Sequence, residues 1–219
     1  MSFMNVAKMW NAMLDAVMPR RGRSVRTAQR SLGHMPLQPT IHEMSGARIT
    51  TIMDYRESAA RDAIQALKYD GSAHAAELCA EALEDFLREE IAAAKSFSAR
   101  DVLLVPIPLH RSRHRERGFN QIEVVLKKLP QEFRDGSLST VAPHALSRIR
   151  ATEQQTHLSR DERIKNVEEA FAVVSHDIVR NAHVFLIDDV TTTGATLLNA
   201  AKRLEQAGAT VSLIALARA

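Results

Sequence analysis

The fold is decided by the stretch Val184-Phe-Leu-Ile-Asp-Asp-Val-Thr-Thr-Thr-Gly-Ala-Thr196. Its apolar start predicts a strand over 183–190, because a continuous apolar run is typical of a strand covered on both faces of a parallel sheet. A helix is expected over 194–207, ended by Gly208, and a last strand over 210–217. Strand, loop, helix and strand form a right-handed βαβ unit, whose ligands bind at the carboxyl ends of the strands. The fold class is therefore α/β.

The turn between this strand and this helix has the groups that a phosphate ligand needs. Backbone N–H groups converge there, and the start of the helix adds partial positive charge, which suits a phosphomonoester. The side chains of Thr192, Thr193 and Thr196 add hydroxyl donors. The turn is therefore predicted to bind an anion.

Two adjacent acids, Asp188 and Asp189, precede the turn. Neighbouring carboxylates repel each other unless they accept hydrogen bonds or share a cation, and ribose hydroxyls and Mg²⁺ meet both needs. The alternative is a helix cap or a solvated turn, where Asp and Thr are common. The full string of buried strand, paired acids and Thr-Thr-Gly-x-Thr is more specific than either part and favours a sugar phosphate site.

Two common nucleotide-binding signatures are absent from the sequence. The eight glycines never fall two residues apart, which excludes the dinucleotide-binding fingerprint. No Gly-Lys-Ser or Gly-Lys-Thr occurs, which excludes a P-loop. The predicted site therefore binds a sugar phosphate by another route.

Further strands and helices are predicted upstream of this unit. Short apolar runs predict strands over 49–53 and 102–105. A helix over 58–68 is expected to stop at Gly71, which is available for a left-handed cap. A second helix over 73–95 has one apolar stripe that includes Cys79, so this thiol is expected to lie in the core rather than to be reactive.

The first 46 residues differ in pattern from the rest of the chain. Apolar residues at three- and four-residue steps predict an amphipathic helix over 1–18, which Pro19 ends. Residues 20–46 show little periodicity, which favours a linker or loosely folded arm and a domain boundary between 1–46 and 47–219. The helix is expected to be buried on the protein's own body, with a membrane surface or a partner protein as alternatives.

The composition excludes several classes of protein. A chain of 219 residues with 45% apolar residues buries a core of its own, which excludes disorder. The single cysteine forms neither an internal disulfide nor a cysteine-built zinc site, which favours a reducing, cytoplasmic location. No apolar run approaches the roughly 20 residues of a membrane-spanning helix, so no transmembrane segment is predicted.

The net charge of +3 includes two arginine clusters, at 20–30 and 111–117. Local basic sites on a nearly neutral body favour anionic ligands or docking surfaces, and the alternative is a solvated cationic face. Direct binding of single-stranded nucleic acid is disfavoured, because Phe119 is the one aromatic platform beside these clusters.

Six ordered motifs carry a resemblance to a known family. They are Leu67-Lys-Tyr-x-Gly71, Val105-Pro-Ile-Pro-Leu-His110, Arg117-Gly-Phe-Asn-Gln121, Arg150-Ala-Thr-Glu-Gln-Gln155, the 184–196 stretch and Leu216-Ala-Arg218. From about residue 50 onward the chain resembles the ComF family, a competence-associated branch of the type I phosphoribosyltransferase-like proteins. The resemblance implies the type I phosphoribosyltransferase fold, a mostly parallel central sheet flanked by helices, here with an N-terminal helical appendage.

The resemblance also implies a ligand, phosphoribosyl diphosphate (PRPP), bound with Mg²⁺. Asp188 and Asp189 would position the ribose and share the metal charge, and Arg150 would reach the pyrophosphate from a flexible hood over 148–171. Guanidinium forks suit pyrophosphate oxygens, so Arg111 and Arg113 are the expected pyrophosphate ligands. The expected substrate-binding set is completed by Lys68, Thr191, Thr192, Thr193, Gly194, Ala195 and Thr196.

Two hypotheses about function stay open at this point. The first is an enzyme, a glycosyltransferase that moves the phosphoribosyl group of PRPP to an unidentified acceptor. The second is a non-catalytic PRPP-binding protein that serves competence and DNA uptake through a DNA-processing protein partner. Many ComF-type proteins share an N-terminal four-cysteine zinc module, but residues 1–46 hold no cysteine, which puts contacts of such a module in doubt here. A homodimer is left open.

Overall fold

A computed structural model describes residues 22–110, 115, 118–149 and 170–219. Within these ranges, no helix is both long enough and apolar enough to cross a membrane. The predicted amphipathic helix over 1–18 lies outside the described residues.

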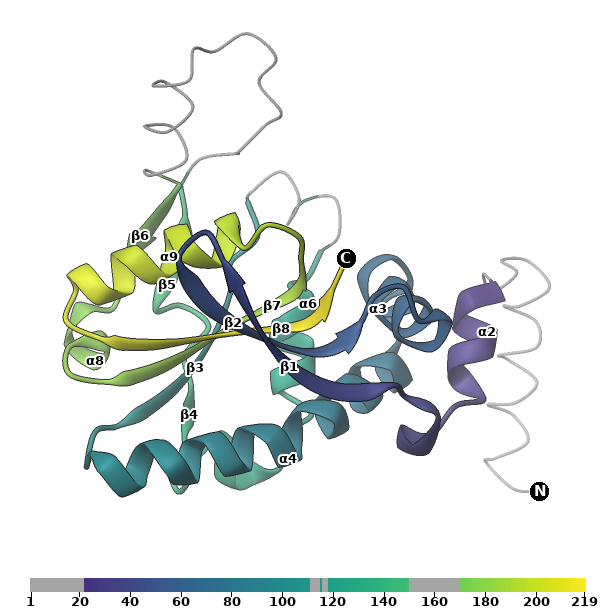
Figure 1. The fold of residues 1–219 in the computed structure, drawn as a ribbon, viewed down its shortest axis with the longest axis horizontal. Coiled ribbons are helices and arrows are strands. Elements are labelled where there is room, and N and C mark those ends of the chain that lie inside the picture. Colours follow the sequence, from purple (N-terminus) through teal and green to yellow (C-terminus); the bar gives the residue numbers. More distant parts are fainter. Residues whose placement is uncertain (1–21, 111–114, 116–117, 150–169) are drawn as a thin grey trace, which may run out of the picture.

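The centre of the molecule is a six-stranded sheet in the order β1-β2-β8-β7-β3-β4 (Figure 1). The strands of this sheet are β1 (Leu37–Met44), β2 (Ala47–Asp54), β3 (Val102–Pro106), β4 (Thr140–Val141), β7 (His183–Thr191) and β8 (Thr210–Arg218). β1 pairs antiparallel with β2, and every other neighbouring pair is parallel. The carboxyl ends of the parallel strands therefore meet at one edge, where α/β proteins bind ligands.

Helices cover both faces of this sheet (Figure 1). The described helices are α2 (Gly22–Ala28), α3 (Ser58–Asp70), α4 (Ala73–Phe97), α6 (Gln121–Leu126), α8 (His176–Val179) and α9 (Ala195–Gln206), with 3₁₀ turns η1 (Leu32–His34) and η2 (Gln131–Phe133). α3, α4 and α6 share one apolar core, which includes Phe185 and Ile187 of β7. α9 packs into a second apolar core, which includes Val184 and Leu186 of β7. The alternation along β7 explains why its sequence is apolar without interruption.

The expected α/β architecture with a mostly parallel sheet is confirmed and is compatible with a phosphoribosyltransferase-like fold. α3 ends at Gly71, whose φ of 60° is the left-handed cap that the sequence predicts. Cys79 is fully buried, and burial raises the pKa of its thiol to about 12. The interpretation of this cysteine as a core residue is therefore confirmed.

The linker predicted over 20–46 is wrong for the described residues 22–46. α2 packs against α3, and β1 forms the edge strand of the central sheet through its pairing with β2. The sequence hides both elements because their side chains are mostly exposed: in α2 only Thr27 is buried, and in β1 only Met44. Backbone pairing and ion pairs, rather than an apolar stripe, hold this segment on the domain.

The predicted hood over 148–171 is described only at its ends. β5 (Leu146–Arg148) and β6 (Phe171–Val173) form a two-stranded antiparallel sheet beside the main one. Residues 150–169 between them lie outside the described residues.

Candidate functional site

A cavity of about 230 Å³ lies at the carboxyl edge of the sheet, between the ends of β7 and β3. Asp188, Asp189 and Val190 of β7 form one wall, and the loop 107–109 after β3 forms another. The start of α6, Lys68 of α3 and Thr196 of α9 also line the cavity. The fold therefore brings together residues from four separate motifs of the sequence.

The two acids of this cavity are held largely by the backbone that follows each of them. The Asp188 Oδ1 atom accepts a hydrogen bond from the backbone N–H of Asp189 at 2.8 Å, and Asp189 Oδ1 accepts one from Val190 at 2.7 Å. The Asp189 Oδ2 atom forms an ion pair with the Lys68 Nζ atom at 2.9 Å. Lys68 thus pairs directly with one of the two neighbouring acids.

Asp188 has the more strongly perturbed environment of the two. Burial, and after it the negative charge of Asp189, raise its pKa to about 7, against the opposing effects of the Asp189 N–H, Lys68 and Arg148. A carboxyl group in this position gains from a ligand that donates hydrogen bonds or brings positive charge. Perturbed carboxyl groups in a cavity are typical of functional sites.

The position of Lys68 follows from the geometry of α3. Lys68 lies in the last turn of that helix, where its positive charge also interacts favourably with the helix dipole. Its side chain is 21% exposed and that of Asp189 is 13% exposed, so the pair is partly shielded from water. The expected substrate-binding residue Lys68 is therefore placed in the cavity beside the expected acids.

Asn120 and Gln121 were not among the expected site residues, and both line the cavity. Asn120 caps α6 by accepting from the N–H of Ile122 at 3.0 Å and donates to the carbonyl of Ile107 at 2.9 Å. This fixes the start of α6 against the loop that follows β3. Gln121 is 1% exposed, and in the described part of the chain its amide nitrogen has no hydrogen-bond partner.

A buried amide N–H without a partner carries a free-energy cost, which a ligand oxygen in the cavity would remove. The motif Arg117-Gly-Phe-Asn-Gln121 marked the helix start in the sequence, but the unpaired donor is visible only in three dimensions.

Arg148 is a third residue of the cavity that the sequence did not assign to the site. It lies at the end of β5, lines the cavity and stacks its guanidinium over the ring of Phe171 at 5.3 Å. Its charge lowers the pKa of Asp188, opposing the effect of burial. The expected arginines Arg111, Arg113 and Arg150 lie outside the described residues.

The expected phosphate loop, residues 191–196, is split between this cavity and the solvent. Thr196 lines the cavity, whereas Thr192, Thr193 and Ala195 are exposed. Thr191 is buried and its carbonyl accepts from the N–H of Ala219 at 3.0 Å. Within the described residues the N-cap Gly194 offers no side-chain cap, and the Ala195 N–H donates to the Thr193 Oγ1 atom at 3.5 Å, which leaves the following N–H groups of the first turn for an anion.

Gly194 is required by the shape of this loop. Its φ is 78°, and a Cβ atom there would lie 2.5 Å from the Ile49 Cδ1 atom. Both the backbone conformation and the contact with β2 exclude a side chain. The glycine thereby lets α9 begin close to the sheet.

The donor set fits Mg²⁺ as an ion that arrives with a phosphate ligand. Mg²⁺ is commonly held by one or two carboxylates together with substrate phosphates, and Asp188 and Asp189 offer two. In the described ranges no group of three or more His, Cys, Asp or Glu side chains could hold a metal ion by itself. Asp188 and Asp189 are thus the described residues that could hold such an ion together with a phosphate.

Three curated proteins illustrate what this chain is similar to. The DNA utilization protein YhgH of Salmonella typhimurium is 33% identical over 132 residues, 59% of this chain and 56% of that protein. Competence protein ComFC of Bacillus subtilis is 33% identical over 120 residues, 55% of this chain and 45% of that protein. Competence protein F of Haemophilus influenzae is 32% identical over 106 residues, which are 48% of this chain and 44% of that protein. The chain thus spans about half the length of the curated relatives that it matches.

The fold is that of an α/β protein with a mostly parallel sheet, compatible with a phosphoribosyltransferase-like fold, and it places two paired acids in a cavity at the carboxyl edge of the sheet. No family model matches the chain. The three relatives nevertheless support its assignment to the ComF family, which the ordered motifs of the sequence indicated.

Proposed function

We propose that the cavity at the end of β7 binds PRPP together with Mg²⁺. The observation that carries the proposal is the pair Asp188 and Asp189, which lies in a cavity beside the first turn of α9. The carboxylates would accept hydrogen bonds from the ribose hydroxyls. Thr196 and the first N–H groups of α9 would donate to the 5′-phosphate.

The remaining polar groups of the cavity suit the diphosphate. Lys68 and Arg148 supply positive charge, and the unpaired amide of Gln121 supplies a donor that gains a partner when an oxygen enters. When bound, Mg²⁺ would neutralise diphosphate oxygens and stabilise pyrophosphate as a leaving group. Asp188 and Asp189 would hold the ribose hydroxyls while the N–H donors of α9 hold its 5′-phosphate. These two contacts would fix the orientation of the ribose ring and of its C1 carbon in the cavity.

The test is ligand-dependent thermal stabilisation, measured with PRPP, ribose 5-phosphate and pyrophosphate, each with and without Mg²⁺. PRPP with Mg²⁺ should raise the melting temperature of the unmodified chain, because a ligand that binds only the folded state stabilises it. The double variant Asp188→Asn, Asp189→Asn should fold and lose this response.

A matched control is Glu89→Gln with Glu90→Gln, which removes two consecutive exposed acids of α4 away from the cavity. The control should respond to PRPP like the unmodified chain. An unchanged response in the double aspartate variant would refute the assignment of the acids to the ribose.

Two roles for PRPP binding are then distinguished by turnover. In the first, a nucleophile attacks C1 of the ribose, the C1–oxygen bond to pyrophosphate breaks, and the phosphoribosyl group passes to the acceptor. Release of pyrophosphate in the presence of a panel of nucleobases would identify this role. The assay varies the acceptor, so the nucleobase that supports pyrophosphate release is identified as the acceptor.

The second role is a non-catalytic PRPP-binding protein that acts in DNA utilisation or competence through a protein partner. The printed names of the relatives favour this biological setting: one is called a DNA utilization protein and two are called competence proteins. Saturable PRPP binding without pyrophosphate release from any acceptor in the panel would support it.

A further inference from the structure

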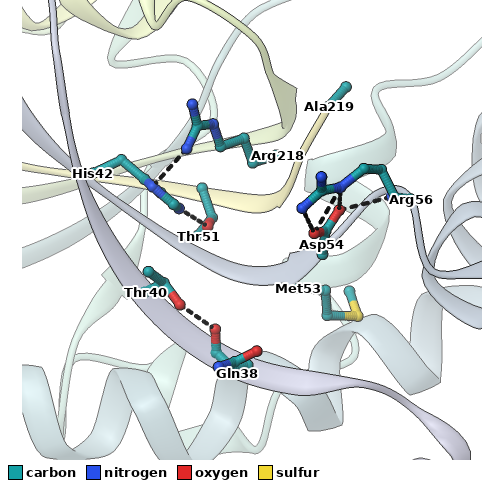
Figure 2. Close-up of a pocket in the computed structure, with 9 residues that line it drawn as sticks. All are labelled: Gln38, Thr40, His42, Thr51, Met53, Asp54, Arg56, Arg218 and Ala219. Atoms are coloured by element: carbon teal, nitrogen blue, oxygen red, sulfur yellow. Dashed lines mark hydrogen bonds and ion pairs between the residues drawn. The ribbon is translucent and has the colours of Figure 1, made fainter.

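A second polar hollow lies on the other side of β7 from the first cavity. It has a volume of about 300 Å³ and is formed by β1, β2 and the end of β8 (Figure 2). It shares no lining residue with the first cavity. Its size is at the lower end for small-molecule sites, about 300–1,000 Å³, so a compact molecule would fill it.

The central group of this hollow is Arg218, the last residue of the motif Leu216-Ala-Arg218. Its Nη1 atom donates to the Nδ1 atom of His42 at 2.9 Å (Figure 2). Because arginine only donates, Nδ1 must carry the lone pair and the proton must lie on Nε2. The Nε2–H group in turn donates to the Oγ1 atom of Thr51 at 3.0 Å.

This chain of hydrogen bonds orients the guanidinium without neutralising it. Thr51 is 2% exposed and anchors the imidazole on the sheet. Burial and the charge of Arg218 both lower the pKa of His42, which keeps the ring neutral at pH 7 and able to accept. Arg218 therefore stays positive and fixed in direction.

Two other charged side chains of the hollow, Asp54 and Arg56, pair with each other. The Arg56 guanidinium binds the Asp54 carboxylate through both Nε and Nη2, at 2.6 to 3.1 Å. Across the described residues, no carboxylate lies within ion-pair distance of the Arg218 side chain. One oriented cation with most of its N–H groups unused is thus left facing a polar hollow, which is the arrangement that recognises a phosphate or carboxylate.

We propose that this hollow is a second ligand site, which takes a compact small molecule through a phosphate or carboxylate group bound by Arg218. Gln38, Thr40 and Thr51 provide polar atoms for the rest of the molecule. The site adjoins the 191–194 loop, because Arg218 is the register partner of Thr191 and Ala219 donates to the Thr191 carbonyl. The proposal does not depend on PRPP binding in the first cavity.

The experiment is a titration of the full chain followed by the imidazole nitrogen signals of His42, which His42→Gln identifies. Inorganic phosphate and citrate are added in separate arms, and the tighter one identifies the recognised group. Either anion should shift the His42 signals in a saturable way, since His42 contacts the binding guanidinium.

Arg218→Gln should weaken the binding of the preferred anion about tenfold or more, because it removes a charged hydrogen-bonding group. The affinity of Arg218→Lys should lie between those of the unmodified chain and Arg218→Gln, since lysine keeps the positive charge but lacks the paired N–H donors of a guanidinium. Arg134→Gln, an equally exposed arginine outside both cavities, is the control and should bind like the unmodified chain.

Two outcomes would overturn the proposal. The first is the absence of a saturable shift of His42 with either anion. The second is equal affinity of the Arg218→Gln and Arg134→Gln variants. The Asp188→Asn, Asp189→Asn variant separates the two sites, because it should keep anion binding at Arg218 whether or not PRPP binds in the first cavity.

Discussion

The helix α3 carries two ionic clusters that satisfy their carboxylates in opposite ways. Towards α2, Asp62 accepts from Arg26 at 2.7 and 2.8 Å and from Arg30 at 3.0 Å. At the last turn of the helix, Lys68 faces the acids of β7 and pairs with Asp189. The first cluster has two cations for one carboxylate, and the second has one directly paired cation for two.

The direction of each pKa shift reflects this difference. Hydrogen bonds from Arg26 and Arg30 lower the pKa of Asp62 although burial opposes them, whereas burial and a like charge raise the pKa of Asp188. The α2–α3 cluster is thus complete within the protein. The β7 pair instead keeps a carboxyl group with a raised pKa in a cavity, which is typical of functional sites.

The largest expected effect is that of Asp62→Ala. The substitution leaves two arginines without their shared partner and loosens α2, so the free energy of unfolding should fall by about 2 kcal/mol. Urea unfolding measures this change. Asp85→Ala, at an exposed position of α4, is the control and should change stability by much less. Equal losses in the two variants would contradict the structural role of the α2–α3 cluster.

A smaller loss is expected for Lys68→Gln. It leaves Asp189 without its paired cation and should lower the free energy of unfolding by about 1 kcal/mol. Adding Asp189→Asn should restore part of that loss, since the unpaired charge is then gone. Lys127→Gln, at an exposed position next to α6, is the matched control. Additive effects of Lys68→Gln and Asp189→Asn would show that the two residues do not interact.

The smallest expected effect is a difference between Asp62 and Asp188 in how each makes stability depend on pH. It is measured as the midpoint of urea unfolding at a series of pH values, in the presence of EDTA. Asp62 has a lowered pKa, so the unfolded chain binds more protons and stability falls as pH drops below the ordinary value of 3.8. Asp188 has a pKa raised to about 7, so the folded chain binds more protons and stability falls as pH rises from about 4 to 7. Asp62→Asn should weaken the first dependence, to which Asp54, Glu77 and Asp135 also contribute, and Asp188→Asn should remove the second. The same pH profile in Asp188→Asn and the unmodified chain would count against the raised pKa.

Sequence reasoning succeeded where burial is continuous. The strand and helix around 184–207, the Gly71 cap and the buried Cys79 follow from apolar runs and periodicity, which reflect the packing on both faces of the sheet. It failed for β1 and α2, whose stability comes from pairing with β2 and from arginine–aspartate contacts. Those contacts join residues far apart in the chain and leave no periodic signal.

The candidate site was predictable only in part. The structure brings Asp188, Asp189, Lys68 and Thr196 into one cavity, as the motifs suggested, but their roles in ligand binding stay predictions. Gln121 was missed because a buried donor without a partner is a property of coordinates, not of residue type. Arg218 was noted only as the end of a motif, and its orientation by His42 depends on the register of β1 with β2 and β8.

The strand order has a consequence for synthesis on the ribosome. The neighbour of β2 in the sheet is β8. β2 ends at residue 54 and β8 begins at residue 210, so β2 is synthesised long before its partner. Until then the β1–β2 hairpin presents an open edge, and pairings so distant in sequence form slowly. The nascent chain therefore completes its central sheet only after β8 has left the exit tunnel, however early β1 and β2 are made.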